Sequence, residues 1–268
     1  MNRNNFREIP YNYTSADDTL IVKHLFNESV ANKLESLRSK RVTGRSAKLL
    51  MRLMGDMFIL RRNPFIYQEL VDSPLRKRRF LNAAYNDLTT IENMAEISDV
   101  TEITKSCRKY LKKLSGSISS HARKRRKMKK ELGAIIGRGN VFFDPFTLVS
   151  HATDATDWRL YLPLAVLRPT HESQVAPLLK AVEKLKLKVI PRGAGTGLTG
   201  GAVPVAPNCV MINTEKLNRI HGINEQEFNN EDGTKVKRPV MTVEAGVITL
   251  NAIDYAEDKG LVFRSQQS

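Results

Sequence analysis

The chain has 268 residues, 41% of them hydrophobic and 26% charged, with a formal net charge of +15, a composition typical of a globular protein. No stretch approaches the roughly 20 consecutive apolar residues that a membrane-spanning helix needs, so we expect no transmembrane segment. The two cysteines, Cys107 and Cys209, lie far apart, which excludes a disulfide framework and a zinc ribbon and predicts a reduced cytoplasmic setting.

The charge is distributed unevenly along the chain. Residues 1–140 contain 29 Lys and Arg against 14 Asp and Glu, whereas residues 141–268 contain 14 of each kind. Such asymmetry between the halves suggests two modules with different surfaces. We therefore predict a basic all-α N-terminal region over residues 1–140 and a second domain over residues 141–268.

Apolar periodicity predicts helices in the first half. Behind a loose capping box formed by Ser15 and Asp18, apolar residues recur at helical spacing from Leu20 to about Leu37. A second apolar run, from Ala47 to Leu60, predicts the next helix.

Two prolines mark further helix starts. Asn63-Pro64 and Ser73-Pro74 each place a capping side chain before a proline at the first helical position, which predicts helices over 64–71 and 74–97. A last, very basic helix is predicted from about Val100 to Leu132, with a break near Ser115-Gly116.

This last helix contains the run His121–Lys130, HARKRRKMKK, with seven Lys or Arg in ten positions. One interpretation is a patch that contacts nucleic-acid phosphates or an anionic membrane. The other is a solvated helix face. The run has no aromatic residue for base stacking, and no DNA-binding or RNA-binding signature accompanies it, so a nucleic-acid partner is disfavoured.

The second half changes to an alternation of strands and helices. Residues 142–163 look extended and rich in turns, and Ala165–Leu167 is a short apolar strand candidate. Thr170 can cap a helix from His171 to about Leu185, and Lys188–Ile190 is the next strand. This β-α-β unit predicts parallel, neighbouring strands.

A glycine-rich loop, Pro191–Gly201, follows this strand directly. It has five glycines in the nine residues from 193 to 201, which is costly in chain entropy. Backbone N–H groups of such a loop can bind phosphate, with Arg192 adding charge and Thr196 or Thr199 a hydroxyl donor. The alternative is a tight, close-packed turn.

The common phosphate-binding loops do not fit this segment. Gly195, Gly197 and Gly200 match G-x-G-x-x-G, but Pro204 and Pro207 follow where a Rossmann helix has to begin. No Gly-Lys-Ser/Thr closes a Walker loop, and the chain has no kinase HRD or DFG motif. The pattern indicates a loop that holds a diphosphate without a helix dipole.

The stretch VIPRGAGTGLTGGAVP, residues 189–204, resembles the diphosphate-binding loop of the FAD-binding domain of the vanillyl-alcohol oxidase (PCMH) type. The flanks resemble the same family, with Pro163–Pro169 as its first strand and Thr242–Val247 as a later strand and turn. A helix from Thr249 to Lys259, stopped by Gly260, follows.

More narrowly, the chain resembles the N-terminal part of large bacterial FAD/FMN-binding oxidoreductases related to D-lactate dehydrogenase and glycolate oxidase. The stretches that carry this resemblance are Arg7–Ser15, Thr43–Ala47, Arg61–Pro64 and Ser150–Arg159. The resemblance implies an α+β fold, in which a helical N-terminal region precedes the first lobe of an incomplete PCMH-type FAD-binding domain over residues 141–268.

The resemblance also implies a cofactor, FAD, and a site. Backbone amides of the loop would hold the FAD diphosphate, through residues Arg192, Gly193, Ala194, Gly195, Thr196, Gly197, Leu198, Thr199, Gly200 and Gly201. The segment Asp154–Asp157 would lie near the entrance of the flavin domain or form a capped turn. Gly246 is expected to need a special backbone conformation near the cofactor.

The implied function is flavin-dependent oxidation of a D-2-hydroxy acid such as D-lactate or glycolate, in the cytoplasm or peripherally at the inner membrane. Arg264–Ser268 does not continue the family pattern, so we expect a truncated fragment without the substrate-binding cap or the iron–sulfur region. The five histidines lie singly, and we nominate no catalytic residue and no metal site. The alternatives are a basic helical module that binds nucleic acid or an anionic surface, and an inactive remnant.

Overall fold

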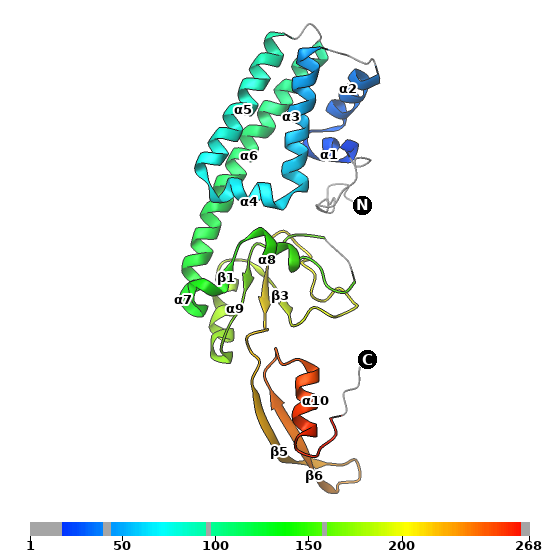
Figure 1. The fold of residues 1–268 in the computed structure, drawn as a ribbon, viewed down its shortest axis with the longest axis vertical. Coiled ribbons are helices and arrows are strands. Elements are labelled where there is room, and N and C mark those ends of the chain that lie inside the picture. The colour runs from blue at the N-terminus through cyan, green and yellow to red at the C-terminus, as the bar shows by residue number, and fades with distance from the viewer. Residues whose placement is uncertain (1–17, 40–43, 95–97, 157–159, 264–268) are drawn as a thin grey trace. The chain divides into compact units, whose positions relative to one another are not determined.

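The computed structural model describes residues 18–39, 44–94, 98–156 and 160–263 (Figure 1). Ser15 of the expected capping box, the Arg7–Ser15 stretch and Asp157 lie outside these residues. The chain divides into two compact units, which are described separately. One comprises residues 1–127 and 144–149, and the other comprises residues 128–143 and 150–268.

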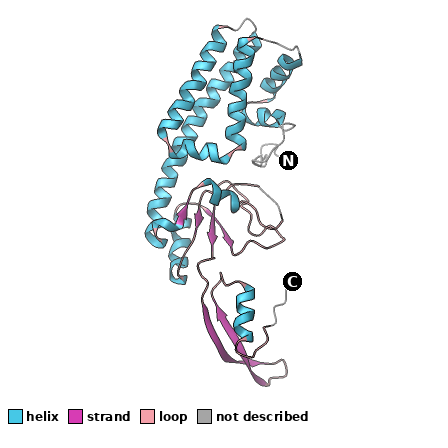
Figure 2. Cartoon of the chain, in the orientation of Figure 1, coloured by secondary structure: helices cyan, strands magenta, loops and turns pink. Residues whose placement is uncertain are grey.

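The first unit consists of helices and short connections in its described part (Figure 2). Its helices are α1 (Asp18–Leu25), α2 (Glu28–Ser39), α3 (Arg45–Arg62), α4 (Pro64–Asp72), α5 (Pro74–Asn93), most of α6 (Ser98–Glu131) and most of α8 (Pro145–Ser150).

The two proline-initiated helices start where predicted, although α5 ends at Asn93, short of the expected residue 97. Asn63 Oδ1 accepts hydrogen bonds from the backbone N–H groups of Phe65 at 2.9 Å and Ile66 at 3.4 Å, which caps α4. Ser73 Oγ accepts from the Arg76 N–H at 3.3 Å and caps α5. Each cap satisfies donors that the first turn of a helix leaves open, and each proline occupies a position where no N–H is needed.

Two sequence predictions about the helices are wrong. The apolar pattern from Leu20 to Leu37 is divided between α1 and α2, because Asn27 Oδ1 accepts from the Val30 N–H at 2.9 Å and starts a new helix. The expected break at Ser115-Gly116 is absent, and α6 runs through both residues. Gly116 is exposed there, and the glycine costs only about 1 kcal/mol relative to alanine.

One apolar core holds the helical unit together. Fully buried side chains on α3, α5 and α6 recur at intervals of three, four or eight positions, which places them on one face of each helix. They include Leu53, Met57, Leu88, Ile91, Ile103 and Leu111.

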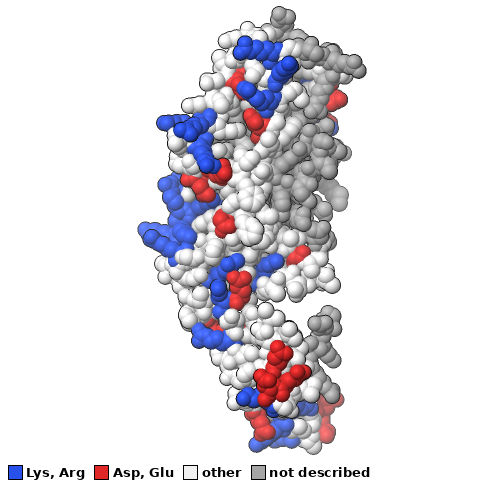
Figure 3. Space-filling model, in the orientation of Figure 1, with Lys and Arg blue, Asp and Glu red and all other residues white. Residues whose placement is uncertain are grey.

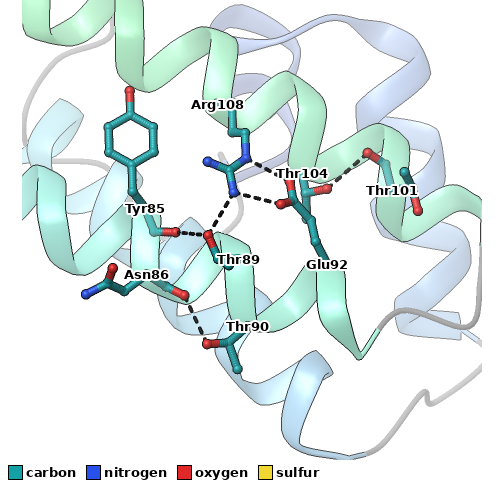
Figure 4. Close-up of polar contacts among 8 residues, drawn as sticks. All are labelled: Tyr85, Asn86, Thr89, Thr90, Glu92, Thr101, Thr104 and Arg108. Carbon is teal, nitrogen blue, oxygen red and sulfur yellow. Dashed lines mark hydrogen bonds and ion pairs between the residues drawn. The ribbon is translucent and has the colours of Figure 1, made fainter.

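A bidentate ion pair joins α5 to α6 beside this core (Figure 4). Arg108 donates through Nε to Glu92 Oε1 at 2.9 Å and through Nη2 to Glu92 Oε2 at 2.7 Å. Arg108 Nη2 also donates to Thr89 Oγ1 at 3.0 Å. The guanidinium holds the pKa of Glu92 below its usual value, and the two-pronged geometry fixes how α5 and α6 align.

The second unit contains a four-stranded sheet with the order β1-β2-β4-β3. Its strands are β1 (Val141–Phe142), β2 (Val166–Leu167), β4 (Cys209–Asn213) and β3 (Lys188–Arg192), and only β1 is antiparallel to its neighbour. The predicted β-α-β strands are therefore parallel, but they are not neighbours, because the fully buried β4 lies between them.

Helix α9 (Val175–Lys184) connects β2 to β3, and its buried Leu178 and Val182 share a core cluster with the sheet. The predicted cap at Thr170 is wrong. A 3-10 turn over Glu172–Gln174 precedes α9, and Gln174 Oε1 accepts from the Thr170 N–H at 2.8 Å. The predicted extended segment 142–163 is also interrupted by α8.

A hairpin of β5 (Ile220–Asn229) and β6 (Lys235–Val243) extends the second unit and was not predicted from the sequence. Its turn is closed by Asp232 Oδ1, which accepts from the Thr234 N–H at 2.9 Å, and by Gly233 at φ +82°. Helix α10 (Thr249–Glu257) follows and ends before Gly260 at φ +70°, as predicted. The remaining helical segments are α7 (Gly133–Ile136) and a 3-10 turn at Arg138–Asn140.

Among the described residues, no helix combines the length and apolar character that crossing a membrane would require.

Candidate cofactor site

Three parallel strands end at the same edge of the sheet. β3 ends at Arg192 and β4 at Asn213, and these two residues are paired in the register of the strands. Arg168 directly follows β2. In parallel sheets this carboxyl edge is where ligands bind, because the connecting loops converge there. The glycine loop, residues 193–201, leaves the sheet from this edge.

The glycine loop is accessible, and its backbone donors are uncommitted. All its residues are exposed or half-buried, and Leu198 is 77% exposed. None of the backbone N–H groups from Gly193 to Gly201 donates a hydrogen bond to a residue that the structure describes. Gly195 at φ +76° and Gly200 at φ +74° lie in the left-handed region that favours glycine. No helix starts between residues 193 and 208, so the exclusion of a Rossmann loop is confirmed.

Arg192 fastens the start of the glycine loop. Its Nη1 donates to the Thr153 carbonyl oxygen at 2.6 Å, and its guanidinium lies over Gly195, where a Cβ would collide with it. Burial lowers the pKa of Arg192, and the carboxylate of Asp154 opposes that shift. The guanidinium is directed at residues 153–154. That Arg192 also adds positive charge for binding a phosphate group therefore stays a prediction.

Asp154 fastens the end of the glycine loop. One carboxylate oxygen, Oδ1, accepts from the Thr156 N–H at 3.0 Å and from the Thr156 hydroxyl, while Oδ2 accepts from the Ala202 N–H at 3.4 Å. The Thr156 donors hold the pKa of Asp154 below its usual value. The capped turn, one of the two interpretations of this segment, is therefore present over the described residues 154–156, and its carboxylate also contacts the loop. We call Thr153, Asp154, Thr156, Arg192 and Ala202 the loop clasp.

A buried polar group beside the clasp was missed by sequence reasoning. Asn213, at the end of β4, bonds through Nδ2 to His151 Nε2 at 2.9 Å and accepts through Oδ1 from the Glu215 N–H at 2.8 Å. His151 and Asn213 are only 6% and 4% exposed. The sequence does carry one indication of it, because the otherwise apolar strand CVMIN ends in the amide side chain of Asn213. The hydrogen bond to Asn213 thereby places His151, which is isolated from other histidines in the sequence, at the carboxyl edge of the sheet.

Glu215 extends this polar group to the next strand end. Arg168 Nε lies 3.0 Å from Glu215 Oε1, and the Arg168 guanidinium also covers the Phe142 ring, 4.6 Å from its centroid. The pairing places a cation and a carboxylate at the ends of neighbouring strands.

Gly246 is required for a reason other than the predicted one. Its φ is not among the positive values of the described glycines. A Cβ would collide with the carbonyl oxygens of Thr214 and Leu217, and the Gly246 N–H donates to the Leu217 oxygen at 2.7 Å. The glycine therefore permits close backbone approach rather than an unusual dihedral angle.

These observations fit a diphosphate group. A row of free backbone donors without side chains binds phosphate oxygens at short range, and the clasp fixes both ends of the row before binding. The described residues contain no group of three or more His, Cys, Asp or Glu that could hold a metal ion. The backbone N–H groups of the glycine loop are therefore suited to an anionic cofactor group.

Two families match the chain. Residues 4–116 match a family described as "Protein of unknown function (DUF3683)", and residues 163–268 match a family described as "FAD binding domain". The second match contains the glycine loop, Asn213 and Gly246, and it begins after Asp154.

Curated relatives match part of the chain. A putative mitochondrial D-lactate dehydrogenase of Schizosaccharomyces pombe is 36% identical over 36% of this chain and 16% of its own length. The glycolate oxidase subunit GlcD of Bacillus subtilis is 30% identical over 42% of this chain and 22% of its own length. A D-2-hydroxyglutarate dehydrogenase of Stutzerimonas stutzeri is 31% identical over 50% and 26%. The matches thus span about a quarter or less of these relatives.

A crystal structure of p-cresol methylhydroxylase with substrate bound also matches, with 22% identity and a TM-score of 0.41 over 52% of this chain and 25% of that chain. The expected fold class, helical region first and FAD-binding domain second, agrees with the family match and with the elements described above. Residues 163–268 of this chain therefore match an FAD binding domain, and FAD is the cofactor that this match indicates.

Proposed function

We propose that Arg192–Gly201 binds the diphosphate of FAD, mainly through backbone N–H groups, and that the chain serves flavin-dependent oxidation of a D-2-hydroxy acid such as D-lactate or glycolate. The observation that carries the first part is the set of uncommitted N–H groups from Gly193 to Gly201. The names of the relatives support the second part.

Bound FAD would supply the two-electron acceptor for the oxidation. The chain's own contribution is to bind and orient the diphosphate end, with the glycines giving access and the clasp fixing the loop ends. Thr196 and Thr199, both exposed, add hydroxyl donors beside the backbone N–H groups. We assign no residue to proton transfer.

We also propose a cytoplasmic location with peripheral contact to the inner membrane. Both Cys107 and Cys209 are free thiols buried in the structure, which fits a reducing compartment.

The test is a titration of the purified 268-residue chain with FAD, followed by flavin fluorescence. ADP, which carries the diphosphate, should compete with FAD, whereas FMN, which lacks it, should compete poorly. Turnover is then assayed with D-lactate, glycolate and D-2-hydroxyglutarate and a dye acceptor. Equal competition by FMN and ADP would refute a diphosphate cradle, whereas binding without turnover would refute only the assignment of the activity to this chain.

A further inference from the structure

The basic run His121–Lys130 is not a uniform solvated face. Arg125 is only 5% exposed, and Lys129 Nζ donates to the Val141 carbonyl oxygen at 2.7 Å. Met128 is buried as well. Part of the run is therefore buried or hydrogen-bonded within the structure, and its other cations are exposed to solvent.

The buried Arg125 fixes the rotation of α6 about its axis. Arg125 Nη1 donates to Asp72 Oδ1 at 3.0 Å, and Nη2 donates to Gln68 Oε1, both on α4. On the same face of α6, His121 packs against Tyr67 with ring centroids 5.9 Å apart. Since this face is held against α4, the opposite face of α6 must point to solvent.

That opposite face carries a row of cations, which we call the α6 stripe: Lys105, Lys109, Lys112, Arg123 and Lys127. All five are exposed. At 100° per residue they fall within about 60° of one another, and at 1.5 Å per residue they extend over about 33 Å. No Asp or Glu occurs in α6 between Ile103 and Lys130, so the stripe is not interrupted by acidic side chains of its own helix.

Helix α5 widens the basic surface. Lys77 Nζ donates to Ser119 Oγ at 2.5 Å, which places the first turns of α5 beside the middle of α6. The next two residues, Arg78 and Arg79, are exposed. Figure 3 shows Lys and Arg side chains gathered along the α5–α6 edge of the helical unit. Arg78 and Arg79 therefore add two exposed cations close in sequence to the contact between α5 and the middle of α6.

The chemistry of the stripe favours a plane of anionic lipid headgroups over nucleic acid. Helices that read bases use Asn, Gln or aromatic side chains besides Arg and Lys. Helix α6 contains no Asn or Gln, and its aromatic residue, Tyr110, packs against Phe26 with ring centroids 5.5 Å apart. None of the exposed large apolar side chains of the described residues lies on α6, so the helix has nothing to insert between bases or lipid chains. A straight row of mostly lysine charges suits electrostatic adsorption to a flat surface.

We propose that the α6 stripe, with Arg78 and Arg79, docks this chain on an anionic membrane surface. The proposal rests on the proposed peripheral location and not on the FAD site, so each can fail without the other.

The experiment measures binding of the full chain to phosphatidylcholine vesicles with and without about one-third phosphatidylglycerol. The stripe variant carries K109Q, K112Q, R123Q and K127Q. The matched control carries K188Q, K216Q, K237Q and K259Q, which removes the same charge from exposed positions of the second unit. Circular dichroism checks that both variants keep their helices, and an FAD titration of each keeps the two proposals separate.

We expect the wild-type chain to bind only the anionic vesicles. Each membrane-facing charge contributes about fivefold, so the stripe variant should bind on the order of several hundredfold more weakly. The control variant should lose much less affinity. Raising the ionic strength from about 0.1 to 0.5 M should release the wild-type chain, because the Debye length falls from about 10 Å to about 4 Å. Equal losses in the two variants, or binding to duplex DNA but not to vesicles, would overturn the proposal.

Discussion

The guanidinium of Arg192 lies over Gly195, three residues further along the chain, in space that a side chain at position 195 would need. This arrangement lets the arginine reach back to the Thr153 oxygen while the loop turns through a positive φ at Gly195. The two residues therefore specify each other. One fastens the loop, and the other makes room for it.

The first prediction concerns this pair. Gly195→Ala should weaken FAD binding and lower the melting temperature, because alanine in the left-handed region costs about 1–2 kcal/mol and its Cβ displaces Arg192. Gly139→Ala is the matched control, because Gly139 lies outside the loop, its Cβ would meet nothing within 4 Å and its φ is not positive. Equal behaviour of the two variants in thermal melts and FAD titrations would show that the Arg192–Gly195 contact is unimportant.

The second prediction concerns Asp154. Asp154→Ala frees the Ala202 N–H and removes the carboxylate charge near the Arg192 guanidinium. The end of the loop should therefore no longer be fixed, and FAD affinity should fall roughly tenfold. Asp232→Ala is the control, since Asp232 makes the same aspartate–threonine turn in the β5–β6 hairpin. A similar loss in both variants would indicate general destabilisation instead of loop positioning.

The third prediction concerns His121, whose pKa is lowered to about 4 by burial and by the nearby charges of Arg125 and Lys124. The unfolded chain binds a proton near pH 6.5 and the folded chain only near pH 4, so stability should fall as the pH drops through this window. The expected loss approaches about 3 kcal/mol at pH 4.

Urea unfolding followed by circular dichroism from pH 7 to pH 4 measures this loss. His121→Asn should flatten the dependence, whereas His221→Asn, at an exposed position of β5, should leave it in place. An unchanged slope in the His121 variant would mean that another group dominates acid destabilisation.

The fourth prediction concerns Cys107, which is fully buried and whose pKa burial raises to about 12. Only the thiolate reacts with disulfide reagents, so the native chain should resist labelling at neutral pH. Cys209 is equally buried in β4. A colorimetric thiol assay should detect little reaction in buffer and both thiols in denaturant. Rapid labelling of the native chain would reveal opening of the helical core.

Local sequence signals determined much of this protein by themselves. Asn63-Pro64 and Ser73-Pro74 fixed two helix starts, because caps and prolines act within one turn of backbone. The glycine-rich segment after β3 indicated an anion loop, since a run of glycines is costly unless the backbone is used directly. The resemblance of residues 189–204 to FAD-binding loops agrees with the family match over residues 163–268.

Contacts between distant residues were decided only by the tertiary structure. The insertion of β4 between β2 and β3, the meeting of His151 with Asn213 and the burial of Arg125 against Asp72 join residues 21 or more positions apart. No periodicity encodes such pairs, because they depend on which apolar faces pack together. The sequence shows where along the chain the charged residues and the glycines lie. Tertiary packing determines which of them are buried, hydrogen-bonded or exposed.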